Sequence, residues 1–235
     1  MHTKTSHAAE DYLKVIYEIT RDAGRASTNE IAEQMGVAPA SATGMIQKLA
    51  GEHTPLLHYE KHRGAVLTSE GEQAALEIIR HHRLLETFLH DKLDYTWDEV
   101  HDEADRLEHV ISEELEERIA RTLGDPSVDP HGEPIPSREF HLPAQLDISL
   151  AELKPGDQAT VARITTSNPD LLRYLASIGL KINSLISVTD VSPFDGNTGL
   201  IIDRNALRCV LGPRITKEIF VMPKRTQMDP PSGVA

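Results

Sequence analysis

A proline- and glycine-rich stretch divides this chain into two parts with different sequence periodicity. Residues 124–143 hold five of the 14 prolines, and proline lacks the backbone N–H that a helix or a central strand needs. Apolar residues recur at helical spacing before this stretch, whereas short β-branched runs follow it. We therefore expect helices first, then an ordered but irregular linker, then a small β-barrel.

The first third of the chain predicts a winged helix-turn-helix, which we assign to residues 1–73. An amphipathic helix over 8–20 is followed by a second helix that Ser27 or Thr28 caps, and Pro39 begins a third helix that reaches Leu49. Two short strands, 56–60 and 65–68, then surround a basic turn. A basic hairpin after a helix-turn-helix is the pattern of a winged helix.

The remaining segments predict two more domains and a tail. One long helix begins at Ser69, and a second is expected from about Trp97 to Leu123, so residues 74–143 form a helical domain with its linker. Short strands between Pro-Gly, Asp-Gly and Gly-Pro pairs predict an SH3-like domain over 149–224, and a flexible tail over 225–235. The expected fold class is mainly α within an α+β chain.

The composition argues against several classes of protein. No apolar run approaches the roughly 20 residues that cross a bilayer, and residues 1–10 lack the layout of a secretory signal. The single cysteine, Cys209, excludes an intrachain disulfide, so we expect a cytoplasmic protein. A net charge of −13 argues against indiscriminate coating of nucleic acid but permits local DNA binding.

Ligand-type side chains share faces on the two expected long helices. On the second helix, four such side chains lie at offsets 0, 4, 7 and 8 counted from His101, which places them within a stripe of roughly 100°. They are His101, Asp105, Glu108 and His109. On the preceding helix, His82 and Glu86 stand four residues apart. Either set also fits an ordinary solvated helix face, but packed together they would suit hard or borderline metal ions.

The sequence gives no positive indication of an enzyme. It contains neither a His-Glu-x-x-His motif nor a nucleophile on a glycine-rich elbow. A metalloenzyme with no DNA role, or a winged-helix regulator that senses a small organic ligand, remains an alternative. We expect structural roles for His81, His131 and Cys209.

Several segments resemble the diphtheria-toxin-repressor family of iron- and manganese-dependent regulators. They are Tyr12–Glu18, "LTSEGEQAALEIIRHHRLLETFL" from Leu67, "VHDEADRLEHVIS" from Val100 and "DPHGEPIPS" from Asp129. The resemblance spans residues 8–137, and "LLRYLASIGL" with "VTDVSPFDGNTGLII" resembles the FeoA-type SH3-like domain of longer members. It implies a metal-activated homodimer that binds palindromic operator DNA and represses metal-uptake genes, with no membrane partner and no organic cofactor.

The resemblance also implies two metal sites per subunit. The regulatory site matches Asp11, Asp105, Glu108 and His109. The second site matches His82, Glu86, His101 and a third-domain residue, either Asp170 or a neighbour such as Asn168.

Two of these positions bear on the identity of the metal. Iron-sensing members place methionine and cysteine where this chain has Asp11 and Asp105, so oxygen replaces sulfur and Mn²⁺ is favoured, with Fe²⁺ as the alternative. Short manganese-specific members carry a glutamate at the position of Lys14, and a protonated lysine cannot ligate a metal there, so we expect two separate sites instead of a closely paired cluster.

The third helix and the wing are the expected DNA-binding surface. The residues are Pro39, Ser41, Thr43, Gly44, Gln47, Lys48, Lys61, His62 and Arg63. No arginine is placed for a bidentate guanine contact, so DNA shape and thymine methyl groups would contribute, while the basic residues bind phosphate. Without metal, we expect the carboxylates of Asp11 and of the helical domain to repel, and an ion to bridge them.

Overall fold

The computed structural model describes residues 6–51, 53–202 and 207–224, which form two compact units. The first comprises the described residues up to 94 together with 102–127 and 134–143. The second comprises 95–101, 128–133 and the described residues from 144 onward. The tail expected at 225–235 lies outside the described residues.

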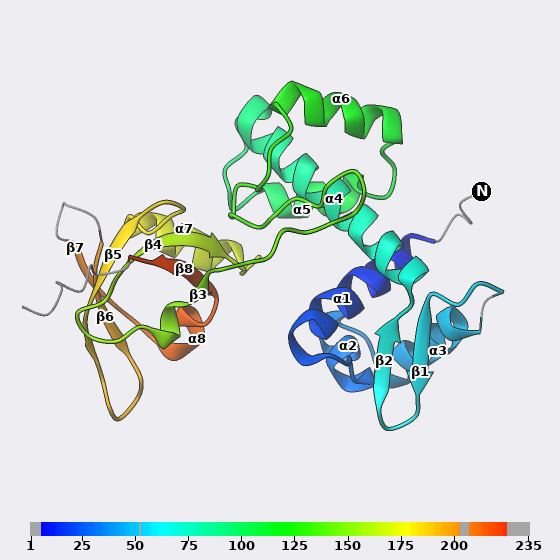
Figure 1. Ribbon diagram of the computed structural model, residues 1–235, viewed down its shortest axis with the longest axis horizontal. Coiled ribbons are helices and arrows are strands. Elements are labelled where there is room, and N and C mark those ends of the chain that lie inside the picture. Colours follow the sequence, from blue (N-terminus) through cyan, green and yellow to red (C-terminus); the bar gives the residue numbers. More distant parts are fainter. Residues whose placement is uncertain (1–5, 52, 203–206, 225–235) are drawn as a thin grey trace, which may run out of the picture. The chain divides into compact units, whose positions relative to one another are not determined.

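The first unit is helical apart from one hairpin (Figure 1). Its elements are α1 (His7–Ala23), α2 (Thr28–Gln34), α3 (Pro39–Ala50), β1 (Leu57–Glu60), β2 (Gly64–Leu67), α4 (Ser69–Leu93), α5 (Val100–Leu107) and α6 (Glu113–Leu123). The first two residues of α5 belong to the second unit.

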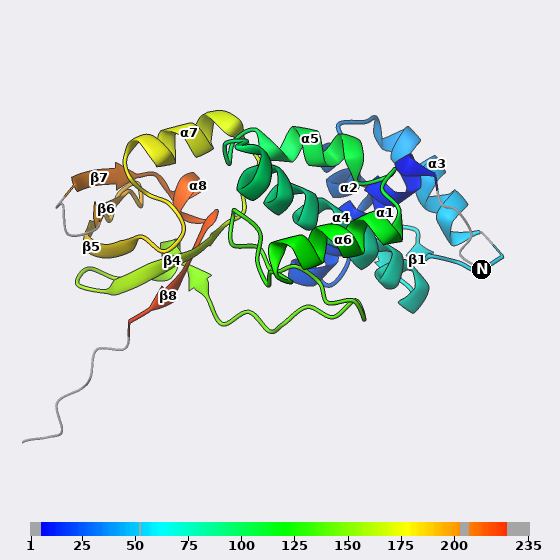
Figure 2. The same ribbon diagram turned by 90° about the horizontal axis from the view of Figure 1, so that it is seen from above.

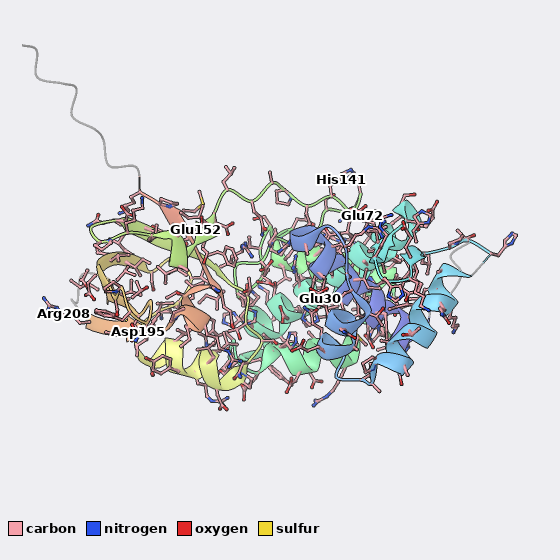
Figure 3. All side chains as sticks on the ribbon, turned by 90° about the horizontal axis from the view of Figure 1, so that it is seen from below. Glu30, Glu72, His141, Glu152, Asp195 and Arg208 are labelled. Carbon is pink, nitrogen blue, oxygen red and sulfur yellow. The ribbon has the colours of Figure 1, made fainter. Side chains whose placement is uncertain are left out.

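The elements α1 to β2 form a winged helix around one apolar core. Leu13, Ile16 and Ile46 are fully buried in it. Ser27 and Glu30 form a capping box at the start of α2, which satisfies backbone N–H groups that the helix itself leaves unpaired. Figure 3 labels Glu30.

A close backbone approach fixes the wing against the helices. Strands β1 and β2 pair antiparallel, with Leu57 opposite Leu67. Gly64 has φ +92°, and a Cβ there would lie 2.5 Å from the carbonyl oxygen of Ala26. Only glycine fits both the backbone angle and the space, and the adjacent Ala65 bridges to Ala26.

Helix α4 leads from the wing into the helical region, as Figure 1 shows. It begins after Thr68, whose hydroxyl accepts a hydrogen bond from Gly71 N. Its middle turns bury charged side chains, including Arg80, Arg83 and Glu86. Carbonyl oxygens of the proline-rich stretch accept from both arginines: Pro136 from Arg80 and Pro134 from Arg83. Residues 124–143 contain no helix or strand, as expected.

The expectation of one continuous helix from about Trp97 to Leu123 is wrong. Helix α5 ends at Leu107, residues 108–110 form a turn, and α6 begins after Ser112. The Ser112 hydroxyl accepts from Leu115 N, and three glutamates lie in the first turn of α6, so a new helix start is stabilised there. Consequently Glu108 and His109 lie in a turn, beyond the end of α5.

The second unit is built on a six-stranded antiparallel sheet. Its elements are β3 (Ile148–Ser149), the 3-10 turn η1 (Leu150–Glu152), β4 (Gln158–Ile164), α7 (Pro169–Ser177), β5 (Leu185–Val191), β6 (Thr198–Ile202), β7 (Leu207–Leu211), α8 (Pro213–Thr216) and β8 (Ile219–Pro223). The strand order is β3-β8-β4-β5-β6-β7, and Figure 2 shows α7 beside the sheet. Strand and helix together confirm the α+β class.

The sheet encloses an apolar core. Val161, Leu172, Leu175 and Ile186 are fully buried in it. Cys209, expected to be structural, is half-buried and packs against this core. Among the described residues, no helix has both the length and the apolar character needed to cross a bilayer.

Candidate functional site

A three-residue donor set joins the first helix to the turn after α5. Asp11 of α1 lies beside Glu108 and His109, and one donor atom from each lies within 4.8 Å of the others. His109 Nε2 is 2.8 Å from Asp11 Oδ1 and 3.6 Å from Glu108 Oε1. Glu108 is buried, whereas the Asp11 side chain is 42% exposed. Two carboxylates and one imidazole in reach of one point fit a divalent cation with oxygen and nitrogen preferences.

The other ring nitrogen of His109 is held by a second carboxylate of α1. His109 Nδ1 is 2.7 Å from Glu10 Oε2, and the ring also stacks on His7 with centroids 4.8 Å apart. A histidine that ligates through one nitrogen is commonly oriented by a carboxylate at the other. Glu10 therefore fixes the His109 ring with its Nε2 facing Asp11 and Glu108.

A second donor set contains Asp105 and is organised around Lys14. The donor atoms of His82, Asp105 and Glu108 lie within 4.8 Å of one another. The Lys14 ammonium is 3.2 Å from Asp105 Oδ1, 3.0 Å from Glu108 Oε2 and 3.1 Å from His82 Nδ1. Asp105 thus lies with Lys14 and His82, while Glu108 is common to both donor sets.

The charges in this cluster shift the protonation of its members. Burial opposes protonation of Lys14, but the carboxylates of Glu108 and Asp105 hold its pKa above the ordinary value. Burial would raise the pKa of Glu108, but His82 and then Lys14 bring it below its ordinary value. Burial raises the pKa of Asp11, in spite of the opposing effect of His109. We expected the carboxylates of Asp11 and of the helical domain to repel one another without metal. That expectation left out Lys14, whose positive charge reduces the repulsion.

The residues assigned to the second metal site are distributed over both units. His82 and Glu86 lie one turn apart on α4, both buried, with His82 Nε2 3.0 Å from Glu86 Oε1. His101 lies on the first turn of α5 and is half-buried. Asp170 is mostly exposed and forms an ion pair with Arg173, while Asn168 caps α7.

A buried network supports the turn that carries Glu108. His81 Nδ1 lies 3.1 Å from the Glu108 carbonyl oxygen, and its Nε2 is 3.2 Å from Glu116 of α6. Burial opposes protonation of His81, but Glu116 raises its pKa above the ordinary value. Glu116 also forms an ion pair with Arg80. In the second unit, His131 is buried, and its Nε2 lies 2.8 Å from the Trp97 carbonyl oxygen. These contacts agree with structural roles for His81 and His131.

The expected DNA-binding residues of α3 are open to solvent. Pro39, Ser41, Gly44, Gln47 and Lys48 are exposed, and Thr43 is half-buried, with its hydroxyl donating to the Pro39 carbonyl. A Cβ added at Gly44 would meet no atom within 4 Å. The opposite face of the helix is buried, so α3 offers one unobstructed face.

The wing presents its basic residues at the end of the hairpin. Lys61, His62 and Arg63 are exposed, and His62 has φ 69°. Glu60 Oε2 accepts from Arg63 at 2.8 Å, and Glu60 Oε1 accepts from Arg25 at 3.1 Å. A phosphate at Arg63 would therefore compete with Glu60.

Sequence reasoning missed Glu10, and it considered Lys14 only as a residue unable to ligate. The sequence contained a signal for both residues, because Glu10 is one position before Asp11 and Lys14 is three positions after it, so they lie on neighbouring faces of one helix. Their partners, however, lie 68 to 99 positions further along the chain.

Family models match all three parts of the chain. Residues 4–65 match the iron-dependent repressor N-terminal DNA-binding domain, and residues 68–137 match the metal-binding and dimerisation domain of the same repressors. Residues 148–223 match the FeoA domain.

Curated relatives include iron and manganese regulators. The iron-dependent repressor IdeR of Mycobacterium leprae is 33% identical over 206 residues, covering 82% of this chain and 87% of its own length. The regulator MntR of Oceanobacillus iheyensis is 37% identical over 110 residues, covering 47% of this chain and 73% of its own length.

Solved structures agree in fold along nearly the whole chain. A manganese-dependent transcriptional repressor in complex with manganese is 40% identical, with a TM-score of 0.86, and covers 92% of this chain and 100% of its own. The IdeR of T. acidophilum is 27% identical, with a TM-score of 0.76, and covers 95% of this chain and 100% of its own.

Proposed function

This chain belongs to the family of metal-dependent transcriptional repressors that includes IdeR and the diphtheria toxin repressor, and from that membership we propose that it represses metal-uptake genes in response to Mn²⁺. Family membership confirms the expected DNA-binding regulator and the expectation that the chain is not an enzyme. The dimerisation domain likewise agrees with a homodimer. The metal, the operator and the ligands are the proposed part.

The observation that supports the proposal best is the donor set shared between α1 and the turn after α5. Asp11 comes from the DNA-binding part, and Glu108 and His109 come from the helical part. An ion held by these side chains would fix α1, and with it the winged helix, relative to the dimer partner's copy. A divalent ion also supplies the positive charge that a buried carboxylate needs.

Manganese is favoured by the chemistry of the donors. The set contains carboxylate oxygen and imidazole nitrogen, and Asp105, which we propose as a further ligand, would add another carboxylate. Hard oxygen ligands suit Mn²⁺, although affinity alone would favour Fe²⁺ at a given site. Fe²⁺ is therefore the second candidate. The assignment of His82, Glu86, His101 and Asp170 to a second site stays a prediction.

The exposed face of α3 and the basic wing are the proposed DNA contacts. Helix α3 would enter the major groove, and Lys48, Lys61 and Arg63 would bind phosphate. Two such surfaces in a dimer would match a palindromic operator. Coupling between metal and DNA is typically about 1–3 kcal/mol, and DNA must tighten metal binding equally.

Operator binding measured with and without Mn²⁺ tests the function. A genomic-fragment selection with the Mn²⁺-loaded protein would supply the operator, and fluorescence anisotropy would then give its affinity with Mn²⁺ or with chelator. We expect chelator to abolish specific binding and Asp11→Ala to abolish the Mn²⁺ response in a folded dimer. Equal operator affinity with Mn²⁺ and with chelator would contradict the proposal and favour a regulator that senses an organic ligand.

The metal preference has its own test. Asp11→Met combined with Asp105→Cys replaces two hard oxygen donors with sulfur, and it should shift the response from Mn²⁺ toward Fe²⁺. Anaerobic dose-response curves for operator binding would measure the shift. An unchanged ratio of the two half-maximal concentrations would remove the argument for manganese.

A further inference from the structure

Lys14 places a positive charge among the donor atoms that a metal ion would use. Its ammonium lies within 3.2 Å of an atom of each residue in the His82, Asp105 and Glu108 set. The Lys14 side chain is only 15% exposed, and that of Glu108 is 1% exposed. The ammonium therefore takes the place that a small cation would take among these three groups.

Both oxygens of Glu108 are engaged by Lys14. The ammonium lies 3.2 Å from Oε1 and 3.0 Å from Oε2. Oε1 is also the atom that faces His109 Nε2 in the Asp11 set. A divalent ion held by Asp11, Glu108 and His109 would thus share an oxygen with Lys14, and two cations on one carboxylate repel strongly where water is excluded.

Asp105 is held by the same ammonium. Its Oδ1 lies 3.2 Å from Lys14 and 3.2 Å from His82 Nδ1. The resemblance leads us to expect Asp105 beside Asp11 and His109 around an ion. To bind that ion, the Asp105 carboxylate must break its ion pair with Lys14.

From these contacts we infer that Lys14 is a built-in competitor for the regulatory metal ion. Its ammonium holds Glu108 and Asp105 and sets the metal concentration at which they are released. The inference rests on the proposed metal-dependent function and adds a residue that determines its threshold. Lys14 also lies on α1, so the same contacts tie the DNA-binding part to the helical part through side chains alone.

The competition predicts opposite effects on metal affinity and on stability. Lys14→Met removes the charge but keeps a side chain of similar length, so Mn²⁺ should bind at least about tenfold more tightly. The metal-free variant should unfold at a lower temperature, because buried carboxylates lose their counter-ion. Lys14→Arg keeps the charge and should bind Mn²⁺ within about threefold of the parent chain.

The experiment combines Mn²⁺ titration calorimetry with lysine modification on the full-length protein. Mass spectrometry after reductive methylation would report the reactivity of Lys14, with exposed Lys154 as internal reference. We expect Lys14 to react slowly in chelator and several-fold faster with Mn²⁺, once released from Glu108 and Asp105.

The two proposals fail in different ways. If the parent chain binds Mn²⁺ but Lys14→Met changes neither the affinity nor the metal-free unfolding temperature, and Lys14 reactivity stays constant, the competitor role is overturned. If the parent chain binds no Mn²⁺ at all, the proposed function fails first. Should Lys14→Met fail to fold, the reactivity of Lys14 in the parent chain alone decides the matter.

Discussion

The metal cluster and the DNA-facing helix are built in opposite ways. The cluster buries Glu108 and His82 among charges that depend on one another, whereas α3 exposes small or singly charged side chains that make few contacts with the rest of the fold. Changes in the cluster should therefore be large, cooperative and non-additive. Changes on α3 should be small, additive and almost confined to DNA affinity.

The largest expected effect is at the residue common to both donor sets. Glu108→Ala leaves Lys14 and His82 without their buried partner, which should cost about 3–5 kcal/mol of unfolding free energy and remove the Mn²⁺ response. Urea unfolding and operator binding would measure the two losses. Exposed Glu114→Ala on α6 is the control. A fully stable Glu108→Ala protein would mean that the charges are not mutually dependent.

A smaller effect is expected at Glu10, which contacts His109 from the side opposite Asp11. Glu10→Ala should weaken Mn²⁺ binding by about 10–100-fold, as loss of an orienting carboxylate usually does. Calorimetry would measure this, and Glu10→Gln should recover part of the loss because its amide oxygen can still accept from Nδ1. Unchanged affinity in Glu10→Ala would show that His109 needs no orienting partner.

On the DNA-facing side, single charges should act weakly and independently. Lys48→Ala should lower the salt dependence of operator binding by about one unit in the log–log slope. It should leave Mn²⁺ affinity in the absence of DNA unaltered. Anisotropy titrations at several salt concentrations give the slope, and Lys154→Ala in the second unit is the matched control. If the parent chain, Lys48→Ala and Lys154→Ala all gave the same log–log slope, Lys48 would lie away from the phosphates.

The smallest expected effect separates stability from DNA affinity. Gly44→Ala meets open space, so it should stabilise the fold by roughly 0.5–1 kcal/mol, as alanine does inside a helix. It should weaken operator binding several-fold if DNA approaches this face closely. Gly36→Ala also meets open space, but φ at Gly36 is +63°, so it should destabilise. Tighter operator binding by Gly44→Ala would contradict the proposed contact.

Local patterns allowed most of the fold to be predicted, because helices and strands depend on nearby residues. Pro39, Ser27 and the basic turn indicated the winged helix, and β-branched runs indicated the sheet. The break after Leu107 was missed because apolar and acidic residues keep helical spacing across it, and Ser112 also fits a helix interior. Short strand β3 and helix α8 contain too few residues to show periodicity.

The candidate site was predictable only in its list of donors. The grouping of Asp11 with Glu108 and His109, and of Asp105 with Lys14, depends on side-chain contacts between elements far apart in sequence. Such contacts follow from packing and not from local periodicity. The same limit explains why Glu10, adjacent to Asp11, had no assigned role.

Diffraction at the manganese absorption edge, from crystals of the full-length protein with Mn²⁺ and operator DNA, tests the central claim most directly. The account predicts an anomalous peak within coordination distance of Asp11, Glu108 and His109, with the Lys14 ammonium moved away from Glu108. The account would be contradicted if, in the protein bound to Mn²⁺ and operator DNA, the Asp11 carboxylate lay far from every manganese peak.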